Sequence, residues 1–222
     1  TIVALLRGHA ASVVAMVFSE DGQLLFTGDL GGQVRVWKTD LFYGIERKDP
    51  LLVTDSLYLE GHQAGILFID TNHDGSLLLS TDGNGQGFVW RRQPNGLFQG
   101  LGDIGSNSGN VAGAVCSDDG KFIAAAGKDQ LLYLFDGEGN PIGVLDQDAP
   151  GIKSCMAFSP EGNRLAVGVI RESSTGSCAV EVYDLPSGNR TTTFREQPSG
   201  TSALSWHPDG TAIASAGGDN HD

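Results

Sequence analysis

The chain has 222 residues, with 14 Lys and Arg against 27 Asp and Glu, so its formal charge is −13. Because no basic run offsets this charge, nucleic-acid binding is disfavoured and protein partners, including those with basic surfaces, are favoured. No apolar stretch approaches the roughly 20 residues of a membrane-spanning helix, so no membrane partner is expected. Three widely spaced cysteines (Cys116, Cys155 and Cys178) fit a reducing compartment and predict a cytoplasmic protein.

An acidic residue followed by glycine recurs along the chain at intervals of 53, 45, 42 and 48 residues. Each pair stands between two short apolar runs, which predicts a β-hairpin because glycine readily takes the positive φ of a tight turn. A period of about 40 to 45 residues is typical of a propeller blade. The pairs are Asp21-Gly22, Asp74-Gly75, Asp119-Gly120, Glu161-Gly162 and Asp209-Gly210.

The apolar runs that follow these turns predict strands buried on both faces. LLFTG, LLLST and FIAAAG do not alternate between apolar and polar residues. Such strands are expected where sheets stack face to face around an axis. Helical periodicity is not evident, and the short, glycine-rich connections argue against a parallel α/β fold.

An aromatic residue follows the turn acid by 16 positions in three units, at Trp37, Trp90 and Phe135. In the fourth unit Tyr183 follows Glu161 by 22 positions, which indicates an insertion of six residues. The Ser- and Gly-rich segment 171–177 is the expected place for it.

Gly8-His9 and Gly61-His62 each place a histidine 12 residues before the turn acid, and Phe135-Asp136 and Tyr183-Asp184 stand where a Trp-Asp pair is expected. With these motifs the chain resembles the WD40 family over essentially its whole length. The resemblance implies an all-β propeller of four-stranded antiparallel blades. A six-bladed TolB-like propeller is the alternative, because SPEGNRLAV followed by VEVYD also fits that pattern.

The resemblance also implies a structural hydrogen-bond network of His, Ser or Thr, Asp and Trp in each blade. The first blade supplies His9, Thr27 and Trp37, with Gly31 at the aspartate position. The second supplies His62, Ser80 and Trp90, with Asn84 at that position. We therefore expect no complete network. The later units keep only parts of it, namely Asp129 with Phe135, Tyr183, and Ser215 with Asp219.

These units predict one propeller segment over residues 1–222, with blades at 10–62, 63–107, 108–148 and 149–197 and a partial blade at 198–222. Residues 1–6 are expected to be the outer strand of a preceding or closing blade. About four and a half blades are then present, and residues outside this chain are expected to complete the ring. Self-association is an expected route to that completion if the native chain is no longer than this one.

The predicted function is a protein-interaction scaffold without catalysis. Loop residues expected near one mouth of the channel are the candidate partner contacts: Asp29, Gln63, Asp82, Lys128 and Asp219. The alternative for the carboxylates is that they only satisfy their own turns. Arg91 and Arg92 are expected to be solvated, and the long linker 39–56 is expected either to contact a partner or to cover a blade edge.

A rival hypothesis is a gating or regulatory domain of a larger hydrolase. Against an active site in this chain, the string nearest to a nucleophile elbow has Asn107 at its centre. The five histidines show no metal-ligand spacing. No catalytic residue, metal or cofactor is therefore predicted.

Overall fold

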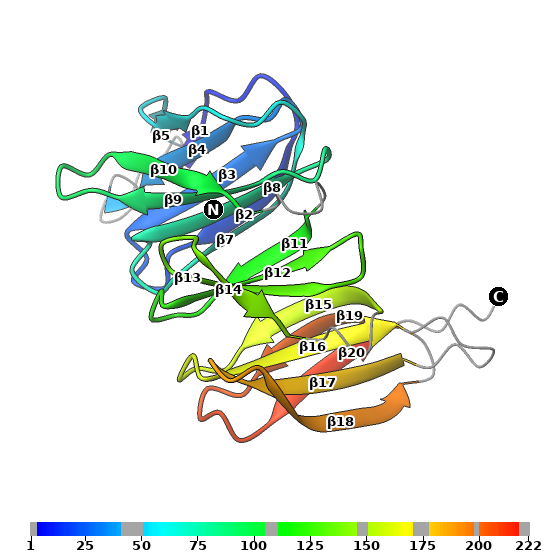
Figure 1. Ribbon diagram of the computed structural model, residues 1–222. Helices are drawn as coiled ribbons and strands as arrows, with labels where there is room; N and C mark the ends of the chain where they lie inside the picture. Colours follow the sequence, from blue (N-terminus) through cyan, green and yellow to red (C-terminus); the bar gives the residue numbers. More distant parts are fainter. Residues whose placement is uncertain are drawn as a thin grey trace.

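The computed structural model describes residues 4–40, 51–104, 111–145, 151–170, 178–197 and 200–217. These residues form strands and turns, without a helix that could span a membrane. Four sheets have four antiparallel strands each, and we call them blades 1 to 4; a two-stranded antiparallel sheet is blade 5 (Figure 1). The prediction of an all-β fold with four-stranded antiparallel blades is confirmed.

The strands of each blade follow one another along the chain, with one interruption in blade 1. Blade 1 has β2 (Val13–Phe18), β3 (Leu24–Asp29), β4 (Val34–Lys38) and β6 (Leu57–Leu59), and blade 2 has β7 (Ile66–Thr71), β8 (Leu77–Asp82), β9 (Gly87–Arg92) and β10 (Phe98–Asp103). Blade 3 has β11 (Val111–Cys116), β12 (Phe122–Gly127), β13 (Leu132–Asp136) and β14 (Pro141–Val144). Blade 4 has β15 (Ile152–Phe158), β16 (Arg164–Ile170), β17 (Cys178–Asp184) and β18 (Asn189–Gln197), and blade 5 has β19 (Thr201–Trp206) and β20 (Ile213–Gly217).

The acidic-glycine pairs form the first hairpin turn of every blade, as the sequence predicts. Their five glycines have φ between 66° and 71°, a region that other residues enter only with strain. The aspartates of blades 1, 2, 3 and 5 close the turn in the same way. Asp21 Oδ1 accepts the amide of Gln23 at 2.9 Å, and Asp74 Oδ1 accepts the amide of Ser76 at 3.0 Å. The residue pattern therefore fixes where the first two strands of each blade turn.

The second strand of a blade is buried on both faces because blades pack face to face. All six residues of β3 and of β8 are buried. Leu24 and Phe26 pack with Ile66 of blade 2, whereas Leu25 packs on the other face with Trp37. Burial of each such side chain contributes about 1.5 to 3 kcal/mol, so the seams between blades hold much of the core.

The first strand of each blade is its inner strand, and inner strands of consecutive blades contact one another (Figure 1). At the seam between blades 1 and 2 the backbone approach is close. A Cβ on Gly28 would lie 2.6 Å from Ile66 Cγ2 and 2.8 Å from Ile69 Cδ1. Glycine is therefore required at this point of β3 for blade 2 to pack against blade 1.

One sheet does not follow the blade pattern. β1 (Ala4–Leu6) pairs in parallel with β5 (Leu51–Val53), and the amide of Arg7 donates to the carbonyl of Val53 at 2.8 Å. The sequence predicts residues 1–6 as the outer strand of another blade; the pairing seen here is instead with the linker. Ala4, Leu6 and Leu51 pack against Trp37, so part of the linker covers a blade face. Residues 41–43 of the linker lie outside the described residues.

The sheets do not close into a ring. On the face of blade 1 that no described blade covers, Met16 and Phe18 are 67% and 51% exposed. The sequence-predicted insertion at 171–177 lies outside the described residues. Completion of the ring by residues outside this chain stays a prediction.

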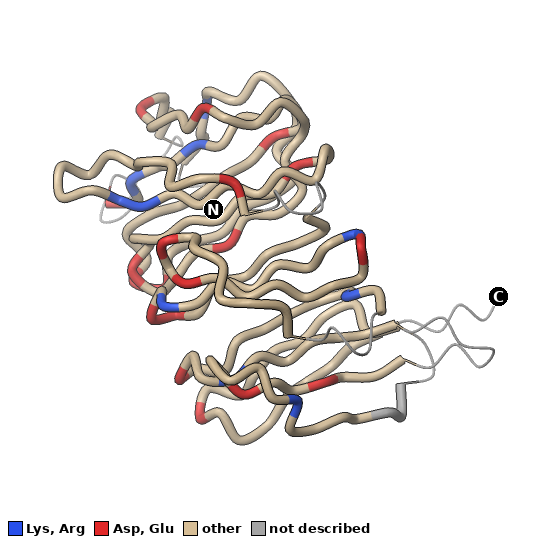
Figure 2. The backbone as a smooth tube through the Cα atoms, in the orientation of Figure 1, with Lys and Arg blue, Asp and Glu red and all other residues tan. Residues whose placement is uncertain are grey.

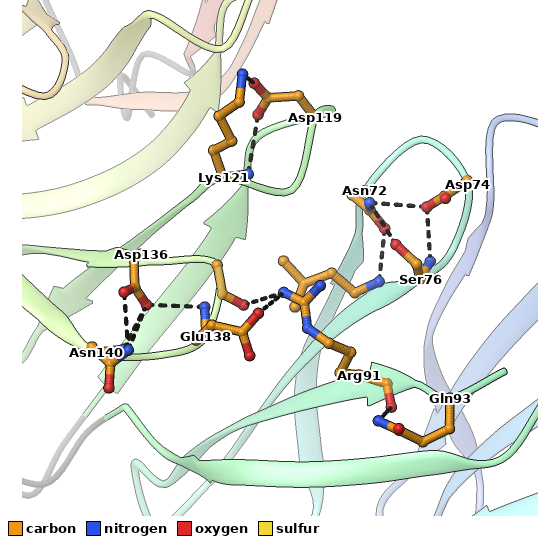
Figure 3. Close-up of polar contacts among 12 residues, drawn as sticks. Asn72, Asp74, Ser76, Arg91, Gln93, Asp119, Lys121, Asp136, Glu138 and Asn140 are labelled. Atoms are coloured by element: carbon orange, nitrogen blue, oxygen red, sulfur yellow. Dashed lines mark hydrogen bonds and ion pairs between the residues drawn. The ribbon is translucent and has the colours of Figure 1, made fainter.

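Acidic residues recur at the hairpin turns of successive blades (Figure 2). Arg91, which the sequence predicts as solvated, has specific partners instead. Its Nη2 donates to the carbonyl of Gly137 at 2.6 Å and lies 3.2 Å from Glu138 Oε1, so it links blade 2 to blade 3 (Figure 3). A turn of blade 3 lies within hydrogen-bond distance of this side chain. The spacing of residues along the chain does not reveal this contact.

Candidate functional site

A hydrogen-bond network connects the strands of blade 1 behind its loops. His9 Nδ1 lies 2.8 Å from Asp29 Oδ2, and His9 Nε2 lies 2.6 Å from Thr27 Oγ1. Trp37 Nε1 donates to the same Thr27 oxygen at 2.8 Å. A neutral His9 that donates from Nδ1 and accepts at Nε2 satisfies every donor and acceptor in this network. The network therefore ties the entering loop to three points of the sheet.

Blade 2 repeats this network with the same geometry. His62 Nδ1 lies 3.0 Å from Asp82 Oδ2 and Nε2 lies 2.7 Å from Ser80 Oγ, to which Trp90 Nε1 donates at 2.9 Å. The side chains of His62 and Asp82 are fully buried. Burial lowers the pKa of His62 by more than the hydrogen bond and charge of Asp82 raise it. His62 is thus held neutral, as the network requires.

The prediction that no complete network is present is wrong for blades 1 and 2. The sequence pattern places the aspartate at positions 31 and 84, where Gly31 and Asn84 stand. The carboxylates come instead from Asp29 and Asp82, two residues earlier, at the ends of β3 and β8. Asp29 Oδ1 also accepts the amides of Gly31 and Gln33, each at 2.9 Å, so one side chain holds the turn and orients the histidine.

A signal for these carboxylates exists in the sequence. Asp29 and Asp82 each follow their turn acid by eight positions and each follow the network hydroxyl by two. The aspartate position of the family corresponds to residues 31 and 84, whereas the two identical offsets point to Asp29 and Asp82. They were also predicted as partner contacts, but both are fully buried. That burial matches the alternative, in which the carboxylates satisfy their own turns.

Blades 3 and 4 stabilise the same region by other contacts. The hydroxyl of Tyr133 donates to Asp129, whose Oδ1 accepts the amide of Leu131 at 3.1 Å. Phe135 is buried in the core cluster shared by blades 2 and 3. In blade 4 the Tyr183 hydroxyl donates to Glu181 Oε2 at 2.7 Å, and Glu181 is fully buried. A polar pair therefore replaces the missing histidine network in each blade.

The remaining predicted residues lie at different places. Gln63 and Lys128 are exposed, Gln63 in the loop before β7 and Lys128 in the turn between β12 and β13. Ser215 lies on β20, and Asp219 lies outside the described residues. Antiparallel pairing puts the starts of inner strands and the turns after second strands at one end of the blades, since Val13 pairs with Asp29. We call this end the loop end.

The loop end is held in place by a buried lysine. Lys153 Nζ donates to the carbonyl of Gln130 at 2.6 Å and to that of Gly151 at 2.8 Å. Gln130 has a φ of 68°, which is uncommon for a residue other than glycine. Blade 4 thus fixes the turn of blade 3 that carries Lys128.

Every inner strand carries a register shift near its start, at the third residue in β15 and at the second residue in the others. The extra residues are Val14, Leu67, Ala112, Ser154 and Ser202. In β7, Ile66 faces Gly28 of blade 1 and Phe68 faces Gly113 of blade 3. Leu67 lies between them, so its side chain packs neither in the seam with blade 1 nor in the seam with blade 3. β-bulges re-aim side chains in this way, and here they form a row of five residues, which we call the bulge row.

The chemistry of the bulge row changes along the blades. Val14 and Leu67 are 48% and 47% exposed, and Phe68 beside them is 53% exposed. Ala112 follows in blade 3, and blades 4 and 5 contribute the exposed serines Ser154 and Ser202. The loop end therefore presents large apolar side chains on blades 1 and 2 and hydroxyl groups on blades 4 and 5. Sequence reasoning missed this row because an apolar run does not reveal a bulge.

Among the described residues, no group of three or more His, Cys, Asp or Glu is arranged to hold a metal ion. The three cysteines carry thiol groups, and those of Cys116 and Cys178 are buried. Burial raises the pKa of the Cys116 thiol well above its usual value, and burial likewise raises that of Cys155. Such thiols are poor nucleophiles, because the thiolate is the reactive form.

The WD40 family, described as WD domain, G-beta repeat, matches residues 1–38, 54–91, 101–136 and 188–221. The chain belongs to this family. The matches leave out all of β15, β16 and β17, although blade 4 has the same four-stranded sheet as the others. The WD40 fold there lacks the family's usual residues, since neither a Gly-His pair nor a network serine is present.

Similar proteins include WD repeat-containing protein 1 of Mus musculus, 27% identical over 95% of this chain and 33% of that protein. The Gallus gallus protein of the same name is 26% identical over the same shares. Angio-associated migratory cell protein of Homo sapiens is 26% identical over 86% of this chain and 39% of that protein. The chain thus spans about a third of the length of these relatives.

Proposed function

We propose that this chain is part of a non-catalytic scaffold that binds other proteins through the loop end of its blades. WD40 repeat proteins generally act as protein-interaction scaffolds, and this chain belongs to that family. The observation that carries the proposal is the bulge row with its exposed Val14 and Leu67. Large apolar side chains that are exposed side by side commonly mark a protein-binding surface.

The loop end also meets the mechanical requirement for a binding platform. In blades 1 and 2 the His9 and His62 networks tie the loops to the sheets, and in blade 4 Lys153 ties down a turn of blade 3. A surface that is already ordered loses little conformational freedom when a partner binds. Gln63 and Lys128 are proposed as polar contacts around the apolar residues.

The net charge of the chain indicates the class of partner, and the state of its cysteines indicates the compartment of the protein. The net charge of −13 favours partners with basic surfaces, because such charge accelerates their association. The cysteine thiols support a reducing compartment, and we infer a cytoplasmic protein.

Selection of displayed random peptides on the wild-type chain tests the proposal. Peptides enriched on the wild type should bind the Leu67→Ser variant about tenfold more weakly or worse, because a buried leucine contributes about 1.5 to 3 kcal/mol. Leu97→Ser is the matched control, since Leu97 is 51% exposed in the turn before β10, away from the bulge row. Equal losses in both variants, or no enriched peptide, would contradict the proposal.

A further inference from the structure

A carboxylate bridges the inner strands of blades 2 and 3. Asp70 lies on β7, and its Oδ2 accepts the backbone amide of Cys116 on β11 at 2.8 Å. The Cys116 thiol lies 3.6 Å from the same oxygen. The positions that correspond to Asp70 in blades 1, 3 and 4 are Val17, Val115 and Ala157, so this bridge occurs at one seam only among the described blades.

No cation neutralises Asp70 within the part of the chain that the structure describes. The described charge that acts on it is Asp118, in the turn after β11, which is also negative. Asp118 in turn is acted on by Glu20 and Asp119, and by His73 with the opposite sign. His73 is paired with Glu20 at 2.7 Å, so it offsets a negative charge of the neighbouring turn. Lys121 is paired with Asp119 at 2.7 Å.

The seam beside this bridge has few large side chains on blade 3. β11 reads VAGAVC, and Phe68 of β7 stays 53% exposed where Gly113 faces it. Farther out, Leu77, Leu79 and Val89 pack with Ile123 and Phe135 and hold the outer part of the seam. β11 contributes only small side chains and Val111 to this cluster, and the Asp70 contact adds a polar link between the two inner strands.

We propose that packing at the seam between blades 2 and 3 depends on pH. The seam is closed when the Asp70 carboxyl is protonated, and it loosens when this carboxyl ionises. The neutral acid accepts the Cys116 amide through its carbonyl oxygen without placing a charge in the seam. The carboxylate gains hydration when the seam opens, and it also moves away from Asp118. Ionisation therefore favours the open seam.

The direction in which closure of the seam changes with pH follows from proton linkage. Burial is the main cause that raises the pKa of Asp70, from 3.8 to about 6, against the opposing effect of the amide hydrogen bonds. The closed seam binds a proton more tightly than the open one, so closure weakens as the pH rises through this window. For an open-state value near 3.8, the opening equilibrium constant should rise about tenfold between pH 5 and pH 8.

Hydrogen exchange of the Cys116 backbone amide, corrected for the intrinsic exchange rate at each pH, measures this opening. In the wild-type chain its protection should fall about tenfold from pH 5 to pH 8. In Asp70→Asn, which keeps an acceptor oxygen but cannot ionise, the protection should not depend on pH. In Asp118→Asn the dependence should remain with its midpoint at lower pH, because a repelling charge is gone.

A wild-type protection that does not change over this range would overturn the inference, whether or not the variants fold. It would also be overturned if Asp70→Asn kept the wild-type pH dependence. The measurement uses no partner, so its outcome is independent of the proposed binding function.

Discussion

Asp82→Ala tests whether the carboxylates at the ends of the second strands hold the network together. The substitution removes three contacts: His62 Nδ1 at 3.0 Å, the Asn84 amide at 3.0 Å and the Gln86 amide at 3.1 Å. A buried donor left without an acceptor costs about 1 to 3 kcal/mol. The His62 group is fully buried, whereas the turn amides are partly so, and we expect a total loss of about 3 kcal/mol.

Urea unfolding followed by tryptophan fluorescence measures this loss as a change in the free energy of unfolding. Asn84→Ala is the matched control, because Asn84 occupies the position expected from the family pattern but is exposed. It should change the free energy of unfolding by less than about 0.5 kcal/mol. The reasoning is refuted if Asn84→Ala costs as much as Asp82→Ala, or if Asp82→Ala costs less than about 1 kcal/mol.

Four further changes test other parts of the structure. Trp37→Ala should cost roughly 3 to 5 kcal/mol in urea unfolding, because a fully buried indole is lost, and an unchanged stability would contradict the strand register. Lys128→Glu should leave thermal unfolding nearly unchanged, because Lys128 is exposed, and should strengthen binding of basic peptides to the loop end, because it replaces a positive charge with a negative one; unchanged binding would contradict a contact at Lys128. In an Asp70→Asn background, stability should fall as the pH drops below 6.5, because burial lowers the pKa of His62 and the unfolded chain takes up its proton first; a flat pH profile would contradict a buried neutral histidine. Arg91→Ala should cost about 1 to 2 kcal/mol through its lost contacts to blade 3, and Arg92→Ala, which has no such cross-blade contact among the described residues, should cost less.

The hairpins and the buried strands could be predicted from the sequence because local chemistry determines them. An acidic residue followed by glycine encodes a tight turn, and the glycines take positive φ at all five positions. The aromatic positions also follow, since Leu25 pairs with Trp37 and Leu78 pairs with Trp90 in the same register. These features depend on residues that lie close together in the chain.

The features that the sequence did not reveal depend on contacts between distant segments. The parallel pairing of β1 with β5 joins residues more than 40 positions apart, and these two strands cover Trp37, which is fully buried. Arg91 donates to a carbonyl of the next blade, and Asp70 accepts the backbone amide of Cys116 from the next blade. The bulge row is invisible in apolar runs such as VVAMVF, because the extra residue has no distinct composition.

The central claim is that partners bind at the loop end, and a hydrogen-exchange footprint tests it most directly. The wild-type chain would be compared with and without a peptide enriched by display selection. We expect added protection in residues 62–68 and 111–114, which contain Leu67 and Ala112, and no change at the acidic-glycine turns. Protection confined to the acidic-glycine turns, at the opposite end of the blades, would contradict the account.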